Sequence, residues 1–510
     1  MRHFWVRELG GWVAAALISI VTVAQLASTA RSELLLRDGD SLVVALLVRS
    51  ITGGETFDWV MSSVLFLPEI AVFAALWLIG QLLSLDVNAV LLINAVVNLV
   101  ALYGAVRFVA GRRRGRTVPV GWSLVALSAF CLLVVTETSA SRDALELASL
   151  LLTTTYYSAT VIAVVLSVGL VRRAYDRPRS ATRLSIVLAG VAFVSTVSNP
   201  LYAAWATAPL GVLLGTAAVY PVARRRALSL LAWLIGGTVI GFVGRIPLSA
   251  WIANSGAEYA QPGLWPESVR YYADLLTVRT STPLGLIGTL LLAALLVFAV
   301  VQTVRARTVG ARLVAAAGWA IPLLVVLGAI VLGTHAARYL EPLFFAPVLA
   351  LVASPVRVTS RTGVSARMPR RAAPVLTAAA ATLLLVGAGL SVPRAVAAAE
   401  HPNTDLRCVN EWVNASGQVG GGQFWTVRLP KLHLDEPTQL VQVDHQLNAY
   451  AWLVNQSDFA PGEVTFLIED AQSSPWALGT NAQPTQVIAC GQYTIYDFSP
   501  TALALGPPRS

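Results

Sequence analysis

The sequence has little charge and almost no lysine. Only 12% of its 510 residues are Asp, Glu, Lys or Arg, about half the share of a soluble domain, which is roughly 25%. Lys431 is the only lysine, and arginine supplies the rest of the positive charge. With 56% hydrophobic residues arranged in long apolar runs, the composition excludes an ordinary soluble enzyme and predicts a polytopic membrane protein.

The sequence also lacks the signs of a nucleotide- or nucleic-acid-binding protein. The net charge of +9 divides into +15 for residues 1–392 and −6 for residues 393–510. The arginines of the first part lie between apolar runs, where positive charge sets orientation in a membrane, so no nucleic-acid partner is expected. A GxxxxGK[ST] motif is absent, which argues against an ATP-driven transporter and a cytosolic nucleotide-sugar enzyme.

Cysteine is scarce, with three residues in the chain. Cys131 lies in an apolar run and is expected to be inert packing. Cys408 and Cys490 lie in the polar C-terminal part. We predict that they form a disulfide if this part is extracytoplasmic; the alternative is two unpaired thiols.

The apolar runs predict a mainly α protein of about 11–12 membrane spans. The candidate spans are centred near residues 20, 70, 98, 127, 163, 192, 213, 236, 293, 322, 347 and 383. Arginine-rich connections follow at 111–116, 172–183, 223–226, 305–312 and 357–371. The positive-inside rule places them, with the N-terminus, in the cytoplasm of a multi-pass plasma-membrane protein. Residues 1–392 then form the transmembrane domain. Residues 393–510, with strand-like alternation, form a small extracytoplasmic α/β domain.

One apolar stretch does not fit this count. Three stretches lie between the N-terminus and the connection at 111–116, although both ends are predicted to be cytoplasmic. Only two of the three can therefore cross. Residues 59–83 contain Pro68 and Glu69, and a proline disrupts a helix interior while a charge is costly in mid-bilayer. We expect this stretch to re-enter or lie along the outer face; the alternative is a normal span with an exceptional loop at 111–116.

The first outer loop, residues 31–58, carries a dense polar cluster. It includes the sequence Asp38-Gly39-Asp40. Two carboxylates flanking a glycine can converge on a divalent cation such as Mg²⁺ or Mn²⁺, or one can act as a base while the other orients it. The alternative is an exposed turn without a function. The first reading makes Asp38 and Asp40 the candidate catalytic pair.

Other polar residues fall on the same predicted face. His335, Arg338 and Tyr339 form a compact group between two apolar runs, where an arginine can hold a phosphate or anchor a helix end to lipid headgroups. Arg245 and Arg270 are further candidate anion or sugar contacts. Asp143 is a second candidate acid, or else part of an interfacial ion pair. Glu69 is either a buried acid of the site or a residue at its lip.

This arrangement resembles the GT-C superfamily of integral membrane glycosyltransferases. The resemblance rests on a first span followed by a long outer loop with Asp38 and Asp40, and on a Pro-bearing segment at residues 67–69. It also rests on Arg142 and Asp143 in a second outer loop and on the late HxxRYLxP-like stretch that begins at His335. The C-terminal tail looks like the extracytoplasmic domains of bacterial members. The sequence lacks the WWDYG-type motif of oligosaccharyltransferases and a clear Asp-Glu pair of protein mannosyltransferases.

The resemblance implies a function. It implies that the chain transfers a sugar from a polyprenyl-phosphate donor to a cell-envelope glycan or lipid acceptor. Asp38 or Asp40 would deprotonate the acceptor or help bind a metal, and His335 and Arg338 would hold the lipid phosphate. The competing interpretation is a non-enzymatic membrane protein of envelope assembly, such as a flippase, a transporter or a scaffold.

Overall fold

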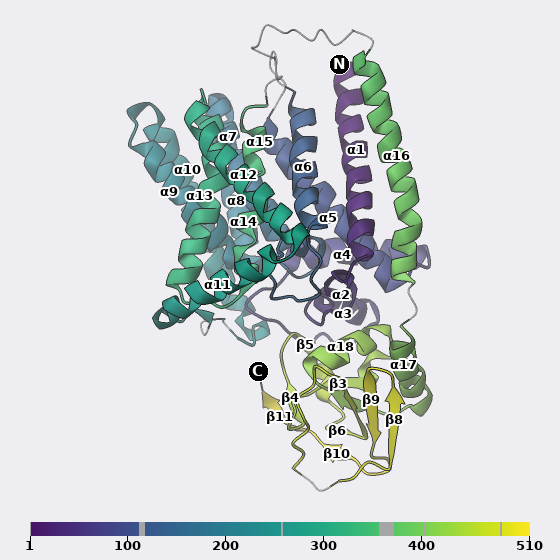
Figure 1. The fold of residues 1–510 in the computed structure, drawn as a ribbon. Coiled ribbons are helices and arrows are strands. Elements are labelled where there is room, and N and C mark those ends of the chain that lie inside the picture. Colours follow the sequence, from purple (N-terminus) through teal and green to yellow (C-terminus); the bar gives the residue numbers. More distant parts are fainter. Residues whose placement is uncertain are drawn as a thin grey trace. The chain divides into compact units, whose positions relative to one another are not determined.

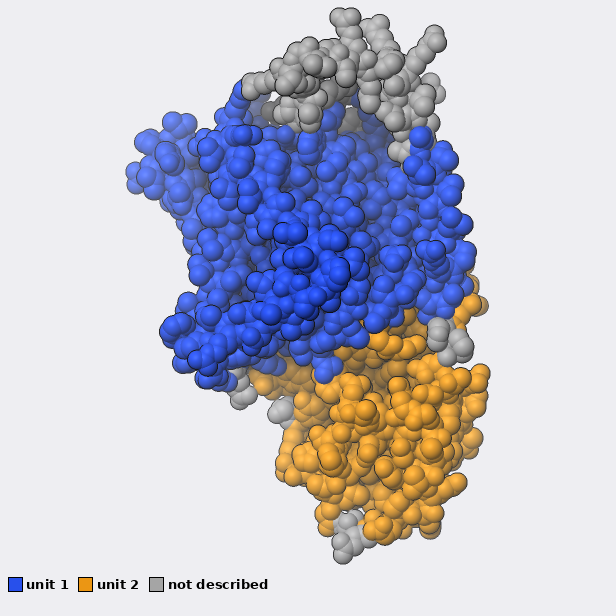
Figure 2. Space-filling view, in the orientation of Figure 1, with its two compact units in different colours: residues 1–32, 92–246, 258–398 blue, residues 33–91, 247–257, 399–510 orange. Residues whose placement is uncertain are grey.

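In the computed structural model the chain divides into two compact units (Figures 1 and 2). The structure describes residues 2–111, 118–254, 256, 259–355, 372–400, 403–479 and 482–509. Unit 1 comprises residues 1–32, 92–246 and 258–398, and unit 2 comprises residues 33–91, 247–257 and 399–510. Unit 2 is therefore assembled from three separate stretches, whereas the sequence predicts one continuous C-terminal domain from residue 393.

Unit 1 consists of helices, most of them long and apolar. They are α1 (Arg2–Ala27), α5 (Val87–Ala110, whose first turn belongs to unit 2), α6 (Pro119–Val135), α7 (Ser158–Asp176), α8 (Ala181–Ser198), α9 (Ala208–Ala218), α10 (Pro221–Gly244), α11 (Trp265–Thr280), α12 (Pro283–Arg305), α13 (Val309–Val331), α14 (Pro342–Phe345), α15 (Leu349–Ala353) and α16 (Ala372–Ala399). The helix α11 contacts α12 and α13 and lies across their ends (Figure 1).

Within the described ranges, eight helices are long and apolar enough to cross a membrane. The other four of the twelve predicted spans form shorter helices. The segments near residues 70, 127 and 213 form the shorter apolar helices α4 (Leu67–Leu82), α6 and α9. The segment near residue 347 is broken between α14 and α15, where Pro347 lacks the N–H group that a continuous helix needs. The arginine-rich segments at 112–116 and 357–371 lie outside the described residues.

Unit 2 contains a mixed sheet of five strands with the order β3-β2-β7-β9-β8. Its strands are β2 (Gly420–Gly422), β3 (Leu440–Gln442), β7 (Phe466–Glu469), β8 (Gln486–Cys490) and β9 (Tyr493–Asp497). The strand β2 runs parallel to β3 and β7, and β9 runs antiparallel to β7 and β8. The glycines of β2 leave room for neighbours, since a Cβ on Gly420 would lie 2.1 Å from the Phe466 ring.

Two helices cover one face of this sheet. The helix α17 (Thr404–Ser416) contributes Val409 and Val413, and α18 (Phe424–His433) contributes Val427, to a buried core shared with the strands. The opposite face packs against loop residues and the short strands β6 (Glu463–Val464) and β10 (Leu503–Ala504). A further short pair joins β4 (Asn448–Tyr450) to β11 (Gly506–Arg509). The predicted α/β character of this region is thus observed.

Residues 33–91 belong to unit 2 because they bind its sheet domain. They form α2 (Ser32–Leu36), α3 (Val43–Thr52), β1 (Trp59–Val60) and α4. The strand β1 pairs with β5 (Val454–Asn455), almost 400 positions later. The guanidinium of Arg49 donates to the carbonyls of Leu432 and Leu434 at the end of α18. The first loop is therefore an integral part of the C-terminal domain.

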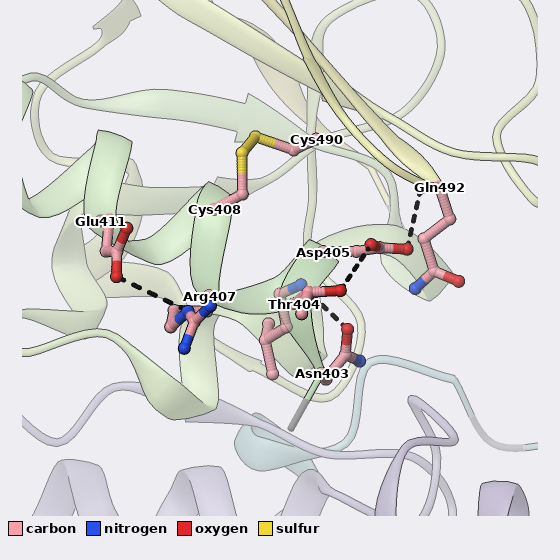
Figure 3. The surroundings of a disulfide bond; sticks show 9 residues. Asn403, Thr404, Asp405, Arg407, Cys408, Glu411, Cys490 and Gln492 are labelled. Carbon is pink, nitrogen blue, oxygen red and sulfur yellow. Dashed lines mark hydrogen bonds and ion pairs between the residues drawn. A yellow bond between two sulfur atoms is a disulfide. The ribbon is translucent and has the colours of Figure 1, made fainter. Parts of the chain in front are cut away.

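The predicted disulfide is present between Cys408 in α17 and Cys490 in β8 (Figure 3). The helix begins beside it at Asn403, whose side chain accepts a hydrogen bond from Leu406 N at 3.0 Å. Asp405 of the same helix accepts a hydrogen bond from Gln492 N at 3.1 Å, at the turn between β8 and β9. The helix α17 and the hairpin of β8 and β9 are thus joined by a covalent bond and a hydrogen bond. The third cysteine, Cys131, is a buried free thiol.

Removing the disulfide is expected to destabilise unit 2. The double substitution Cys408→Ser/Cys490→Ser opens a loop of 82 residues in sequence separation, and such loops contribute about 2–4 kcal/mol by restricting the unfolded chain. Lys431 is 7% exposed, so amine-reactive labelling of this single lysine across a urea series measures the unfolding midpoint. The control Cys131→Ala lies in unit 1 and is expected to leave that midpoint unchanged. An unchanged midpoint in the double variant contradicts the prediction.

Candidate functional site

A cluster of aromatic and basic side chains lies in unit 1 where α13 ends. We call it the Arg338 cluster; its members are Tyr259, Tyr271, Tyr272, His335, Arg338 and Tyr339. It contains three of the predicted donor-binding residues. The chain reverses at Gly333, whose φ of +65° favours glycine and where a Cβ would lie 1.8 Å from the carbonyl oxygen of Gln261. The turn is followed by the short helix η7 (Ala337–Leu340), which contains Arg338 and Tyr339.

Hydrogen bonds from α11 fix this turn. The hydroxyl of Tyr272 lies 2.7 Å from Thr334 Oγ1, and the hydroxyl of Ser268 donates to the carbonyl of Thr334 at 2.8 Å. The indole of Trp205 donates to the carbonyl of Tyr339 at 3.1 Å. The position of the His335–Tyr339 segment is therefore set by buried partners on two other elements.

The rings of the cluster contact one another. Ring centroids are 5.5 Å apart for Tyr271 and His335, 5.1 Å for Tyr271 and Tyr272, and 6.5 Å for Tyr259 and Tyr339. The guanidinium carbon of Arg338 lies 5.7 Å from the centre of the Tyr339 ring. His335 is exposed, and Arg338 and Tyr339 are half-buried. The cluster thus presents a cation, an imidazole and several phenols on an accessible surface.

Three phenols of this cluster, those of Tyr271, Tyr272 and Tyr339, have a raised pKa. Burial raises the pKa of Tyr271, and the charge of Asp143 raises it further, while a hydrogen bond with the Ala337 backbone and the charge of Arg338 act against the rise. Burial likewise raises the pKa of Tyr339 and of Tyr272. At neutral pH these side chains are therefore hydrogen-bond donors.

Asp143, a predicted acid that belongs to unit 1, acts on this cluster through its charge. Its charge acts on Tyr271, although it lies more than 120 positions earlier in the chain. Its carboxylate is exposed, and its backbone N–H donates to Ser141 Oγ at 3.2 Å. A guanidinium and several phenols, with a carboxylate whose charge acts on one of them, can bind a ligand that has both an anionic group and hydroxyl groups.

The other two predicted arginines also belong to unit 1. Arg245 donates to the carbonyl of Val197 at 2.6 Å and reaches that of Thr196 at 3.5 Å, so it caps the C-terminal end of α8. Burial lowers the pKa of Arg245. Arg270 is exposed on α11, next to Tyr271 in sequence.

The predicted catalytic acids belong to unit 2. Asp38 Oδ1 accepts hydrogen bonds from the backbone N–H groups of Asp40 at 3.2 Å and Ser41 at 3.3 Å, so it shapes the turn. A Cβ on Gly39 would lie 3.1 Å from the Trp425 ring. The first loop therefore lies directly on α18, and both acids are half-buried.

Arg428 of α18 anchors this turn. Its guanidinium donates to the carbonyl of Gly39 at 3.0 Å, to two carbonyls at 452 and 453, and to the side chain of Gln442. It also lies 3.8 Å from the centre of the Phe424 ring. Burial lowers the pKa of Arg428 to about 10, while the charges of Asp40, Tyr450 and Asp38 act against the fall. Asp38 and Asp40 thus supply negative charge to the buried guanidinium of Arg428, a role that is separate from catalysis.

Glu69 also lies in unit 2. It is 7% exposed and stands in the first turn of α4, directly after Pro68, where the helix dipole favours an acid. In the parts of the chain that the structure describes, no three His, Cys, Asp or Glu side chains gather as a metal site would require. The predicted Mg²⁺ or Mn²⁺ site remains a prediction.

Three charged residues that the sequence reasoning did not single out are among the most buried in unit 1. Arg31 and Glu137 are fully buried, and Arg279 is 4% exposed. They lie within or contact residues 137–155, the segment that contains the predicted second outer loop with Arg142 and Asp143. Residues 145–155 of this segment are buried throughout. The sequence offers one sign of this burial, the presence of charges next to apolar runs. The same pattern is equally typical of an exposed loop.

No family model matches the sequence, and no curated protein matches it either.

Proposed function

We propose that the chain is a GT-C-type membrane glycosyltransferase that transfers a sugar from a polyprenyl-phosphate donor to a cell-envelope glycan or lipid acceptor. The observation that carries the proposal is the Arg338 cluster, which combines a half-buried guanidinium, an imidazole and several phenols at the end of an apolar helix, with the charge of Asp143 acting on Tyr271. A lipid-linked sugar phosphate has the matching parts: an apolar chain, an anionic phosphate and hydroxyl groups. The plasma membrane is the proposed location.

The reaction balances with these groups. The oxygen of the acceptor hydroxyl forms a bond to the anomeric carbon of the sugar, and its proton passes to a carboxylate. The bond between the anomeric carbon and the phosphate oxygen breaks, and its electron pair leaves with polyprenyl phosphate. Arg338 and His335 stabilise the charge on this leaving group. Asp40 or Asp38 is the proposed base; Asp40 suits this role better, because Asp38 Oδ1 already accepts two backbone hydrogen bonds.

Two observations support an extracytoplasmic C-terminal region and a cytoplasmic N-terminus. The Cys408–Cys490 disulfide is typical of oxidising compartments. The segment that carries it is acidic, whereas the arginines concentrate in the connections of residues 1–392.

The leaving group provides a test that does not require the sugar to be known. Arg338→Gln in the full chain in nanodiscs is expected to weaken binding of polyprenyl monophosphate about 10- to 100-fold, because a hydrogen bond to a charged group contributes roughly 1.5–3 kcal/mol. Binding of the uncharged polyprenol is expected to stay unchanged. Native mass spectrometry or a lipid-binding titration measures both affinities.

The matched control is Arg307→Gln, an exposed arginine between α12 and α13, which is expected to bind polyprenyl monophosphate normally. Equal affinities for Arg338→Gln and the native chain would refute the assignment of the phosphate site. Binding of the lipid phosphate without sugar transfer by membranes, and without an effect of Asp38→Asn or Asp40→Asn, would favour a non-enzymatic flippase, transporter or scaffold.

A further inference from the structure

The guanidinium of Arg31 binds both ends of the segment at residues 139–149. Arg31 donates from Nη1 to the carbonyls of Ser139 at 3.0 Å and Ser141 at 2.7 Å, and from Nε to Ser149 Oγ at 2.8 Å. Its Nη2 donates to the carbonyl of Glu146. These four acceptors lie on both sides of Asp143, so the arginine fixes the two ends of the short stretch that carries this acid.

Glu137 makes a second set of contacts with the same segment. The carboxylate of Glu137 accepts hydrogen bonds from the backbone N–H groups of Ala148 at 2.8 Å and Ser149 at 2.7 Å. It also pairs with Arg279 Nη1 at 3.7 Å, and that atom donates to the carbonyl of Leu145 at 2.6 Å. Burial raises the pKa of Glu137, while Arg31, Arg279 and Ser149 act against the rise.

Arg279 connects this segment to the Arg338 cluster. It stands at the end of α11, the helix that carries Tyr271 and Tyr272 two turns earlier. Gly288 of α12 makes room for it, because a Cβ there would lie 2.7 Å from Arg279 Nη2 and 2.4 Å from Thr136 Oγ1. The loop with Asp143 and the helix with Tyr271 are therefore tied together by buried contacts.

We propose that Arg31 is a positioning residue of the Arg338 cluster: its guanidinium fixes residues 139–149, the segment that carries Asp143 and that contacts the end of α11 through Arg279. Arg31 itself does not touch the ligand. The inference deepens the proposed function and rests on it for the ligand, whereas the position of the loop can be measured without any ligand.

The geometry requires arginine at this position. The four acceptors are spread around the guanidinium and are met by Nε, Nη1 and Nη2. Lysine presents its three donors from one nitrogen atom and cannot reproduce this planar fork. Arg31→Lys is therefore expected to behave like Arg31→Gln and not like the native residue.

The first arm of the test measures the loop. Ala140 is exposed between two of the carbonyls that Arg31 binds, and in a Cys131→Ala background Ala140→Cys supplies one reactive thiol for a spin label. We expect the label to be ordered in the native chain and markedly more mobile with Arg31→Gln or Arg31→Lys. The control Arg107→Gln removes a partly buried arginine that pairs with Glu8 at 2.5 Å, and should leave the label ordered. An equally ordered label in both Arg31 variants overturns the proposal.

The second arm measures whether Arg31 acts through Asp143. One negative charge beside a bound phosphate weakens its binding, so Asp143→Asn is expected to raise the affinity for polyprenyl monophosphate about fivefold. In the Arg31→Gln background the same substitution is expected to have no effect, because the loop no longer holds residue 143 in place. The same fivefold gain in both backgrounds, or no gain in the native background, overturns the proposal. If no background binds the probe, the proposed function fails while the label still reports on Arg31.

Discussion

Lys431→Met is expected to destabilise unit 2 by about 3–5 kcal/mol, the typical cost of removing one partner of a buried ion pair. Lys431 Nζ lies 2.8 Å from Asp458 Oδ2 and donates to the carbonyl of Leu440 at 2.8 Å. The side chains are 8% and 1% exposed, so water cannot replace the lost cation. A urea series in which reduction of Cys408–Cys490 is trapped by alkylation measures unfolding of this unit, because Cys490 is buried.

Two controls separate the buried charge from the general effect of a substitution. Arg407→Met breaks the pair of Arg407 with Glu411, whose side chains are 67% and 73% exposed, and is expected to cost less than about 1 kcal/mol. Lys431→Met/Asp458→Leu removes both charges and is expected to recover most of the lost stability. A double variant as unstable as Lys431→Met would indicate that packing around Lys431, and not charge, is responsible.

The loss caused by Lys431→Met should depend on pH. Burial raises the pKa of Asp458 in the native chain, and Lys431 acts against the rise, so removing the lysine raises the pKa further. A group whose pKa is higher in the folded state stabilises the fold at low pH, and this stability is lost as the pH increases through that pKa. The deficit of Lys431→Met is therefore expected to be smaller at pH 4.5 than at pH 7.5.

The local features of this fold were predictable from the sequence. Apolar runs near 20 residues long became helices, and the cysteines that follow the last of them became a disulfide. Both predictions need only composition and the order of segments along the chain. Among the residues that the structure describes, four predicted spans form shorter helices, because Pro347 interrupts one run and the other three helices end after 11 to 17 residues.

The composite nature of unit 2 was not predictable in this way. Arg49 and Arg428 connect the first loop to α18 across more than 380 positions, and β1 finds its partner in β5. Hydropathy and turn patterns carry no information about such partners, since an arginine that binds carbonyls looks like any loop arginine. The acids Asp38 and Asp40 were therefore noticed for their spacing, while the cation that they balance was not.

The candidate site in unit 1 was predicted in part. His335, Arg338 and Tyr339 stood out because they interrupt an apolar stretch, and Asp143 does lie close enough to act on Tyr271. Arg31, Glu137 and Arg279 were missed because charges at the ends of apolar runs are normally assigned to solvent. The structure buries them because each satisfies backbone groups of a non-helical segment, which is tolerated inside an apolar environment only when its polar groups are paired.

Glu137→Gln tests whether pairing with buried backbone groups stabilises this non-helical segment. We expect it to lower the free energy of unfolding of unit 1 by about 3–5 kcal/mol. The carboxylate supplies acceptors for two backbone N–H groups and negative charge for Arg31 and Arg279. A glutamine offers one oxygen and turns its NH₂ group toward another donor, so one N–H loses its partner and the arginines lose their counterion. Labelling of the buried Cys131 by a thiol-reactive fluorophore during heating measures the unfolding temperature, which should fall by roughly 10 °C.

Asp176→Asn is the matched control, because Asp176 also pairs with a buried arginine, Arg172 at 3.5 Å, but its own side chain is 29% exposed. Water can take the place of this carboxylate, so we expect Asp176→Asn to lower the unfolding temperature by less than a few degrees. Glu137→Gln/Arg279→Met removes one buried charge of each sign and should be more stable than Glu137→Gln alone. If Glu137→Gln unfolds at the native temperature, the backbone and Arg31 suffice to hold the segment, and the link between Asp143 and α11 through Arg279 has no energetic weight.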